Sequence, residues 1–392
     1  MQGRSLNRPE ERLALACADL PVSASAAQRA EALLREPLDW ARLHAFADRH
    51  RIGQRVYRHL LVRARSLVPP AELDRAAESF FSRAHRNAIL ASELLRIHRA
   101  LDVRGIACIP FKGPLMSLAL YGSIAYREYA DLDVMIRRPD LAEADGALNA
   151  IGFLPESPIL GPAAAIDLAS EHAYPYVHAE TGTRLELHCE LAQRYFPFPL
   201  HAQELFANAV PLAWNGAVFR TLGAEDALLV ASMHGAKHCW LWLDLICCMA
   251  ATLRAAAPVR WDELLRRAAA LGALRMLLLG LELARELFDA ELPAHTGELI
   301  RRDRKIAALR DEVVASLFSV PGTRATFVRM PWFHQAVRER LRDRVHYRIA
   351  GLTSPEFGDL HAVPLPKRAF ALYRLIRPLR VLALYGRSLT GR

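Results

Sequence analysis

Two aspartates separated by one residue are the clearest sign of chemistry in this sequence. In Asp131-Leu132-Asp133-Val134 polar and apolar residues alternate, which is typical of a strand with one buried face. Asp131 and Asp133 would then project from the same face, about 7 Å apart at roughly 3.4 Å per residue. Such a carboxylate pair suits Mg²⁺, with Mn²⁺ as the alternative, because both ions accept oxygen ligands and leave coordination positions for substrate phosphates. The pair therefore predicts metal-assisted chemistry on a phosphate.

A third carboxylate on a neighbouring strand would complete a site for two metal ions. Glu186 fits this role, because Leu185 and Leu187 on either side of it indicate a strand with its leucines turned toward the core. In a two-metal site one ion activates an attacking hydroxyl and the other stabilises the leaving phosphate group. We therefore predict Asp131, Asp133 and Glu186 as catalytic residues and metal ligands.

The residues before the aspartates are suited to binding phosphate. The apolar run of residues 105–111 predicts a buried strand that ends at Lys112-Gly113, where Pro114 begins a short helix. Glycine at such a turn lets backbone N–H groups approach a phosphate, and the helix N-terminus is aimed at it. Lys112 adds positive charge, and Arg127 offers a planar fork to another phosphate oxygen. This context matters, because Asp-x-Asp alone is more often an ordinary solvated strand face.

Four short motifs follow one another in this region: a Lys-Gly turn, a Tyr-Gly pair, an arginine and Asp-x-Asp. They are Phe111-Lys112-Gly113, Leu120-Tyr121-Gly122, Arg127 and Asp131-Leu132-Asp133. In this order they resemble a bacterial family of uncharacterised nucleotidyltransferases. The resemblance extends over most of the chain through Asp39-Trp40, His50-Arg51, Glu186-Leu187-His188, His234, Lys237-His238, Trp240, Asp244 and Arg377-Pro378.

The resemblance implies a polymerase-beta-like core that transfers a nucleotide from an NTP such as ATP. It also implies nucleotide-binding roles for Lys112, Gly113, Tyr121, Gly122 and Arg127. The chain departs from the wider superfamily at the phosphate turn, where Gly-Ser or Gly-Gly is usual and this sequence has Lys112-Gly113-Pro114. The usual serine contact is therefore missing, and we expect Lys112 to compensate for it.

A group of residues after residue 186 is a candidate lining of the substrate pocket. It consists of His188, His234, Lys237, His238, Trp240 and Asp244. His234 and His238 share a helical face, as a zinc site needs, but no third ligand accompanies them, so buried hydrogen-bonded histidines or a pocket lining are the alternatives. Trp240 fits either stacking on a base or packing in the core. His188 belongs either to the pocket or to the catalytic strand.

The order of predicted elements indicates an α+β fold with three parts. Apolar residues at three- and four-residue spacing predict helices over residues 10–19, 26–35, 39–50, 54–64 and 71–104. A strand–helix–strand–helix–hairpin order then predicts a small mixed sheet, with its hairpin formed by residues 172–179 and 183–189. Further helical runs follow at residues 228–251, 261–287 and 304–317, with a proline-containing connection at 353–366. We therefore expect an N-terminal helical region (1–100), a nucleotidyltransferase core (101–222) and a C-terminal helical region (223–392).

The charge of the chain is uneven. Residues 301–392 contain 19 Lys and Arg against 7 Asp and Glu, a balance of +12 within a net charge of +9. Such a basic segment favours an anionic partner such as nucleic acid, although a solvated terminal helix face is the simpler interpretation. The first 20 residues lack the apolar core of a signal peptide, and charges interrupt the most apolar run, 228–251. We therefore expect a cytoplasmic protein without stable membrane insertion.

Two functions remain open from the sequence. The first is a Mg²⁺-dependent transferase that moves an NMP from an NTP to a small molecule, a peptide or an RNA end. The second is a catalytically inactive nucleotide- or nucleic-acid-binding module that uses the basic C-terminal region. The sequence identifies neither the acceptor nor the NTP.

Overall fold

A computed structural model of the chain describes most of its residues. The ranges it leaves out are 1–7, 21–22, 157–171, 194–195, 197, 256–257, 320–324, 355–358, 360–361, 364, 367–368, 370–371 and 391–392. Much of the predicted connection at 353–366 therefore lies outside the described residues. The described residues form the α+β fold that the sequence predicts, with helices on both sides of a small mixed sheet.

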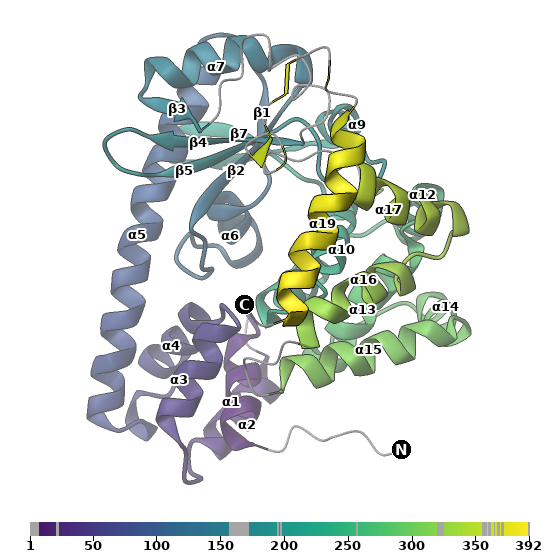
Figure 1. Ribbon diagram of the computed structural model, residues 1–392. Helices are drawn as coiled ribbons and strands as arrows, with labels where there is room; N and C mark the ends of the chain where they lie inside the picture. Colours follow the sequence, from purple (N-terminus) through teal and green to yellow (C-terminus); the bar gives the residue numbers. More distant parts are fainter. Residues whose placement is uncertain are drawn as a thin grey trace.

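Four short helices begin the chain, followed by one long helix. They are α1 (Pro9–Ala18), α2 (Ala24–Leu33), α3 (Trp40–Arg49) and α4 (Gly53–Val62), and a 3₁₀ turn, η1 (Arg65–Leu67), leads into α5 (Pro70–Asp102). The Asp39 carboxylate accepts a hydrogen bond from the Arg42 N–H at 3.0 Å, which confirms the predicted N-cap. Helix α5 connects the N-terminal helices to the sheet (Figure 1), because it packs on α4 and also on α6 and α7.

The strands that carry Asp131, Asp133 and Glu186 lie in a five-stranded sheet with the order β1-β2-β5-β4-β3. The strands are β1 (Cys108–Pro110), β2 (Asp131–Ile136), β3 (Phe153–Pro155), β4 (Ala173–His178) and β5 (Arg184–His188), with α6 (Gly113–Tyr121), η2 (Arg138–Asp140) and α7 (Leu141–Ala150) between them. Strands β2 and β5 pair in parallel, and the register places Asp133 opposite Glu186. The other pairs in this sheet are antiparallel, including the predicted β4–β5 hairpin.

A second, two-stranded sheet was not predicted. Helix α9 (Ala202–Asn208) leads into β6 (Val210–Trp214), which pairs with β7 (Ala217–Thr221). The turn residues Asn215 and Gly216 both have positive φ values, 49° and 76°. Asn-Gly is the strongest short-range hairpin signal, so this pair in the sequence could have revealed the hairpin.

The helical runs predicted after residue 223 exist, but two of them are interrupted. The run over 228–251 is divided into α10 (Ala224–Lys237) and α11 (Leu243–Arg254), and the run over 261–287 into α12 (Trp261–Leu271) and α13 (Leu274–Phe288). The prediction of continuous helices was therefore wrong at residues 238–242 and at Gly272, which has a φ of +72°. The remaining helices are α14 (Ala294–Arg302), α15 (Arg304–Leu317), α16 (Ala325–Ala336), α17 (Leu341–Thr353) and α19 (Tyr373–Thr390).

The sheet lies between two hydrophobic cores. One contains Leu132, Val134 and Leu185 together with residues of α5 and α7. The other contains Met135 and joins the N-terminal helices to α10, α11, α13 and α15. The three-part division of the chain stays a prediction, because its two flanking helical parts share this second core. None of the helices in the described part of the chain has the length and apolarity that crossing a membrane requires.

Candidate active site

A cleft of about 650 Å³ lies where the acidic face of the sheet meets α5, α6 and α10. The predicted site residues that line it are Lys112, Gly113, Arg127, Asp131, Asp133, Glu186, His188, His234, Lys237 and His238. Residues that the sequence analysis did not assign to the site also line it, among them Arg51, Arg83, Arg86, His172 and Trp242. Arg83 and Arg86 lie on α5, whereas Arg51, His172 and Trp242 lie in connections between elements, so the fold brings them together.

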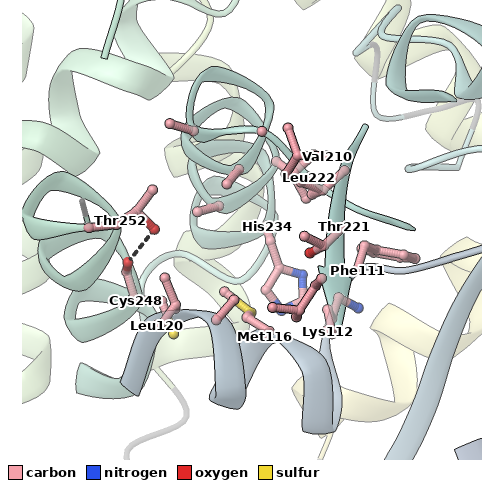
Figure 2. Close-up of a pocket in the computed structure, with 18 of the residues that line it drawn as sticks. Phe111, Lys112, Met116, Leu120, Val210, Thr221, Leu222, His234, Cys248 and Thr252 are labelled. Atoms are coloured by element: carbon pink, nitrogen blue, oxygen red, sulfur yellow. Dashed lines mark hydrogen bonds between the residues drawn. The ribbon is translucent and has the colours of Figure 1, made fainter. Parts of the chain in front are cut away.

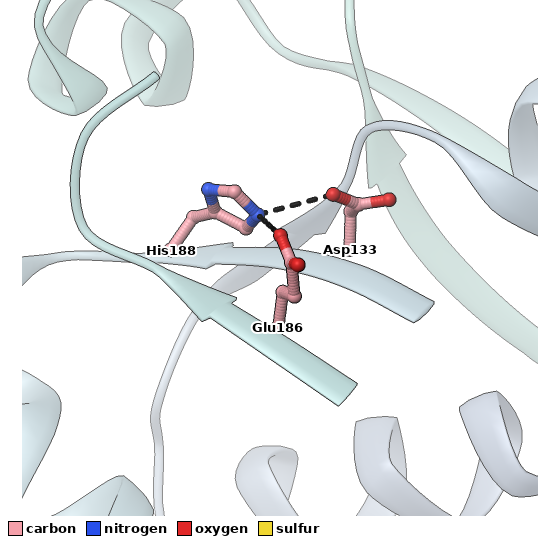
Figure 3. Close-up of side chains that lie close together, drawn as sticks. All are labelled: Asp133, Glu186 and His188. Carbon is pink, nitrogen blue, oxygen red and sulfur yellow. Dashed lines mark hydrogen bonds and ion pairs between the residues drawn. The ribbon is translucent and has the colours of Figure 1, made fainter. Parts of the chain in front are cut away.

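Three side chains from the paired strands form a compact group in this cleft. Ligand atoms of Asp133, Glu186 and His188 all lie within 4.8 Å of one another. The Nε2 of His188 is 3.0 Å from an Asp133 oxygen and 3.2 Å from a Glu186 oxygen (Figure 3). Burial by itself would lower the pKa of His188, but its hydrogen bonds to the two carboxylates outweigh burial and raise that pKa. His188 therefore lies on β5, the strand that carries Glu186, and also lines the cleft.

Asp133 has a second cationic partner. The Nζ of Lys112 lies 2.7 Å from the same Asp133 oxygen that faces His188. Burial would raise the pKa of Asp133, but the Lys112 charge and the His188 hydrogen bond hold it well below the usual range. Asp133 is therefore ionised, and Lys112 joins the phosphate turn to the acidic strand face.

Asp131 lies in the same cleft but outside this compact group. Burial raises its pKa first, and the negative charges of Asp133 and Glu186 raise it further. The acidic face thus carries negative charge that Lys112 and His188 do not fully compensate. Such a face fits a divalent cation, since three carboxylates from paired strands supply the oxygen ligands that Mg²⁺ prefers. The structure brings Asp133 and Glu186 together as predicted ligands and adds His188 to them.

Further positive charge lines the same cleft. Arg51 has a φ of +58°, and its guanidinium stacks over the Trp242 ring at 3.8 Å from the centroid. Lys237 projects from α10, and burial followed by the charge of Lys112 lowers its pKa to about 8. Arg86 lies on α5, and neither it nor Arg51 forms a salt bridge with another described residue. These cations are available to a polyanion in the cleft.

The phosphate turn has the backbone that the sequence predicts. Gly113 has a φ of +61°, and a Cβ there would lie 3.6 Å from the Asp131 carbonyl oxygen. Lys112 is the N-cap of α6, with Pro114 in the first turn of that helix. The start of α6 therefore lies in the cleft, beside the acidic strand.

Arg127 has a different partner from the predicted phosphate. Its Nη2 donates to the Asp244 carboxylate at 2.7 Å, and Arg55 donates to the other oxygen of that carboxylate at 2.8 Å. Asp244 is 3% exposed and Arg55 is fully buried, so this group of three lies behind the cleft. The phosphate-binding role of Arg127 stays a prediction, although its side chain does reach the cleft wall.

Three other candidate residues are placed away from the described lining of the cleft. The hydroxyl of Tyr121 accepts a hydrogen bond from Arg55 at 2.9 Å, and Gly122 ends α6 in a left-handed conformation. Trp240 is fully buried, and a Cβ at Gly235 would lie 2.5 Å from its ring. Of the two alternatives for Trp240, the structure therefore favours packing in the core.

His234 of α10 and His238, the residue that follows this helix, form a neutral pair at the cleft wall. The rings of His234 and His238 are edge to face, with centroids 4.6 Å apart. Burial first, then the charge of Lys237, lowers the pKa of His238 to about 4, and burial and Lys112 lower that of His234. No other potential ligand joins them in a described metal group, so the structure favours a pocket lining over zinc.

Part of the basic charge of the C-terminal region is used within the fold. Arg338 is fully buried and stacks on Phe196 and Tyr347. Arg377 and Arg380 both form salt bridges with Asp359. Binding of nucleic acid by this region stays a prediction.

The sequence profile of a family described as "Uncharacterised nucleotidyltransferase" matches residues 36–289, well over half of the chain. The match includes all the described residues that line the cleft and the core that contains Leu132, Val134 and Leu185. No curated protein matches the chain, and no solved structure matches it.

Proposed function

The chain belongs to this uncharacterised nucleotidyltransferase family, and on that basis we propose that it transfers an NMP from an NTP to an acceptor nucleophile in the cleft. The observation that carries the proposal is the opposition of charge within one cavity. The carboxylates of Asp131, Asp133 and Glu186 line the cleft together with the cations of Lys112, Lys237 and Arg51. A metal–triphosphate complex has the matching distribution of charge.

The triphosphate would bind at the phosphate turn. Gly113 allows the phosphate to approach the backbone at the start of α6, where N–H groups point outward. Lys112 lies between this turn and Asp133, so its ammonium can neutralise a phosphate oxygen without leaving the acidic face. Lys237 and Arg51 would bind the remaining phosphate oxygens, and Trp242, held flat under Arg51, offers a surface for the base.

The acidic face would hold Mg²⁺. Asp131, Asp133 and Glu186 are its proposed ligands, and the ion would neutralise phosphate charge and activate the attacking group. His188 positions two of these ligands, because one ring nitrogen contacts both Asp133 and Glu186. The other ring nitrogen, Nδ1, is buried and has no partner among the described residues. His188 is therefore a positioning residue within the acidic face.

The test is calorimetric titration of the full chain with each of the four NTPs, with and without Mg²⁺. We expect Mg²⁺ to tighten binding of one NTP at least tenfold in the wild type. In Asp131→Asn/Asp133→Asn the ion has lost two ligands, so binding becomes insensitive to Mg²⁺. Binding without the ion is retained or strengthened there, because two carboxylates that repel the triphosphate are gone.

The matched control is Asp74→Asn/Asp102→Asn, which neutralises two exposed aspartates of α5 outside the cleft. It should retain the full Mg²⁺ effect. The proposal fails if the cleft variant keeps that effect, or if the wild type binds every NTP equally well with and without Mg²⁺. Circular dichroism of each variant checks that the comparison is made on folded protein.

A further inference from the structure

A second cavity opens beside the catalytic cleft. It has a volume of about 310 Å³ and is enclosed by α6, α10, α11 and the β6–β7 hairpin. Figure 2 shows Met116, Leu120, Leu222 and Thr252 facing this common space. Phe111, Lys112, Arg127, Val230 and His234 line both this cavity and the cleft, so the two share a wall. We call the second cavity the apolar chamber.

The chamber offers little to a polar ligand. Its charged lining residues within the described chain are Lys112 and Arg127, and both belong to the shared wall. Arg127 is already paired with Asp244. On the far wall the Thr252 hydroxyl donates to the Cys248 carbonyl at 2.8 Å, as drawn in Figure 2. Most of the remaining lining is aliphatic, from Met116 and Leu120 to Val230.

We propose that the apolar chamber binds the acceptor, and that the acceptor is an alcohol with an uncharged apolar body and its hydroxyl at the shared wall. This inference rests on the proposed nucleotidyl transfer. A cavity of about 150 Å³ holds one benzene molecule, so the chamber accommodates a body of roughly a dozen heavy atoms. The favourable binding free energy comes from removing that apolar surface from water.

The alternative acceptors fit the chamber less well. A sugar or an RNA end would bring hydroxyls and phosphates into a space with few partners, and each unpaired polar group costs about 1–3 kcal/mol. A triphosphate belongs in the neighbouring cleft, where Arg51, Arg86 and Lys237 lie. The division of polar and apolar walls between the two cavities therefore separates donor from acceptor.

The shared wall places the acceptor hydroxyl where transfer can occur. His234 lies at this wall beside Lys112 (Figure 2), and its neutral imidazole can accept a hydrogen bond from the hydroxyl. In the reaction the alcohol oxygen forms a bond to the α-phosphorus of the NTP. The bond from that phosphorus to the oxygen bridging to the β-phosphate breaks, pyrophosphate leaves, and the hydroxyl proton passes to the solvent.

The experiment compares two probes of similar size on the full chain. 4-Phenylbutan-1-ol has an apolar body, whereas myo-inositol is a polar alcohol of about the same number of heavy atoms. Ligand-observed NMR measures the Kd of each probe, and release of pyrophosphate from the NTP with Mg²⁺ measures transfer. We expect 4-phenylbutan-1-ol to bind and to stimulate release, and myo-inositol to do neither.

Filling the chamber provides the structural control. Ala231 lines the chamber on α10, and Ala231→Phe should weaken binding of 4-phenylbutan-1-ol at least tenfold. Ala119→Phe, at an exposed rim position on α6, should act in the same direction without disturbing the core. Ala142→Phe, at an exposed position of α7 outside the chamber, should leave binding unchanged.

The possible results distinguish failure of the chamber inference from failure of the proposed nucleotidyl transfer. If the NTP binds with Mg²⁺ but the apolar probe does not, or if myo-inositol is the better acceptor, the chamber inference is overturned and the transfer proposal stands. Probe binding that neither filling variant weakens overturns the chamber as its site. If the probe binds but no NTP does, both the acceptor role and the transfer proposal are overturned.

Discussion

At the scale of single residues, Lys112 is the most informative side chain of the site. It contacts Asp133 at 2.7 Å and lines both cavities, so one ammonium lies among the acidic face, the phosphate turn and the apolar chamber. Burial lowers the pKa of His234 and Lys237, and the charge of Lys112 lowers both further. Lys112 therefore affects the charge of neighbouring groups in the cleft, whereas its compensation for the missing serine contact stays a prediction.

The lowered pKa of Lys237 leads to a pH prediction. With a pKa of about 8 instead of 10.5, Lys237 is charged below pH 8 and becomes neutral as the pH rises through that value. A triphosphate binds the charged form better, so NTP affinity should fall several-fold between pH 7 and pH 9. Titration calorimetry at each pH measures this fall in affinity. Near pH 8, NTP binding should also take up protons, and titrations in buffers of different ionisation enthalpy detect this uptake.

Two substitutions isolate the contribution of Lys237. Lys237→Arg keeps the charge over this range and should remove the fall in affinity, because guanidinium does not titrate below pH 10. Lys237→Met should bind the NTP more weakly than the wild type at pH 7, and its NTP affinity should vary little with pH. An unchanged pH profile in Lys237→Met would contradict the assignment.

At the scale of elements, the interruption between α10 and α11 shapes the wall of the cleft. Cys239 and Trp240 have φ values of 51° and 53°, a left-handed conformation that is rare for residues other than glycine. The buried Trp240 ring compensates by packing where Gly235 and Gly280 leave room for it. The turn ends α10 directly after Lys237, so the packing of Trp240 holds a cleft residue in place.

This packing predicts that Gly235→Ala is destabilising. A Cβ at Gly235 would lie 2.5 Å from the Trp240 ring, which must then move within a filled core. Overpacking of this kind costs about 1–3 kcal/mol and should lower the unfolding midpoint in thermal denaturation. Gly351→Ala is the control, because Gly351 lies within α17 with no atom close to the added Cβ. It should be neutral or slightly stabilising, and equal effects of the two substitutions would contradict the packing argument.

The sequence predicts these elements well where local pattern decides them. The N-terminal helices, the strand with Asp131 and Asp133 and the Gly113 turn follow from periodicity, capping and glycine. The interruption before α11 does not, because residues 228–251 are mostly apolar and the turn is held by the packing of Trp240 against Gly235 and the distant Gly280.

Local sequence pattern likewise predicts only part of the candidate site. Glu186 could be paired with Asp133 from its strand pattern, whereas the approach of Arg51 and Arg86 to the cleft depends on how α5 and the N-terminal helices dock. No spacing within the sequence encodes that docking. The Asp244 partner of Arg127 is 117 residues away, for the same reason.

At the scale of the whole molecule, Asp244 connects three parts of the chain. It lies in the first turn of α11, and its carboxylate binds Arg55 of α4 and Arg127 of the segment that leads into β2. Burial would raise the pKa of Asp244, but the two guanidinium groups hold it below the usual value. Asp244 is therefore ionised above acidic pH, and the stability it contributes is lost as the pH falls through its own pKa. The N-terminal helices, the segment that leads into β2 and α11 are joined at this carboxylate.

Asp244→Ala should therefore destabilise the entire fold. It leaves the buried side chains of Arg55 and Arg127 without their anion, and removing one partner of a buried ion pair costs about 3–5 kcal/mol. Thermal and denaturant unfolding should show this loss, whereas Glu298→Ala, at an exposed pair on α14, should not shift the midpoint measurably.

A triple variant, Asp244→Leu with Arg55→Met and Arg127→Met, removes all three charges and should recover most of the stability. Its NTP affinity then decides the role of Arg127: wild-type affinity in the stable triple variant assigns Arg127 to the fold, and lost affinity assigns it to the triphosphate as well.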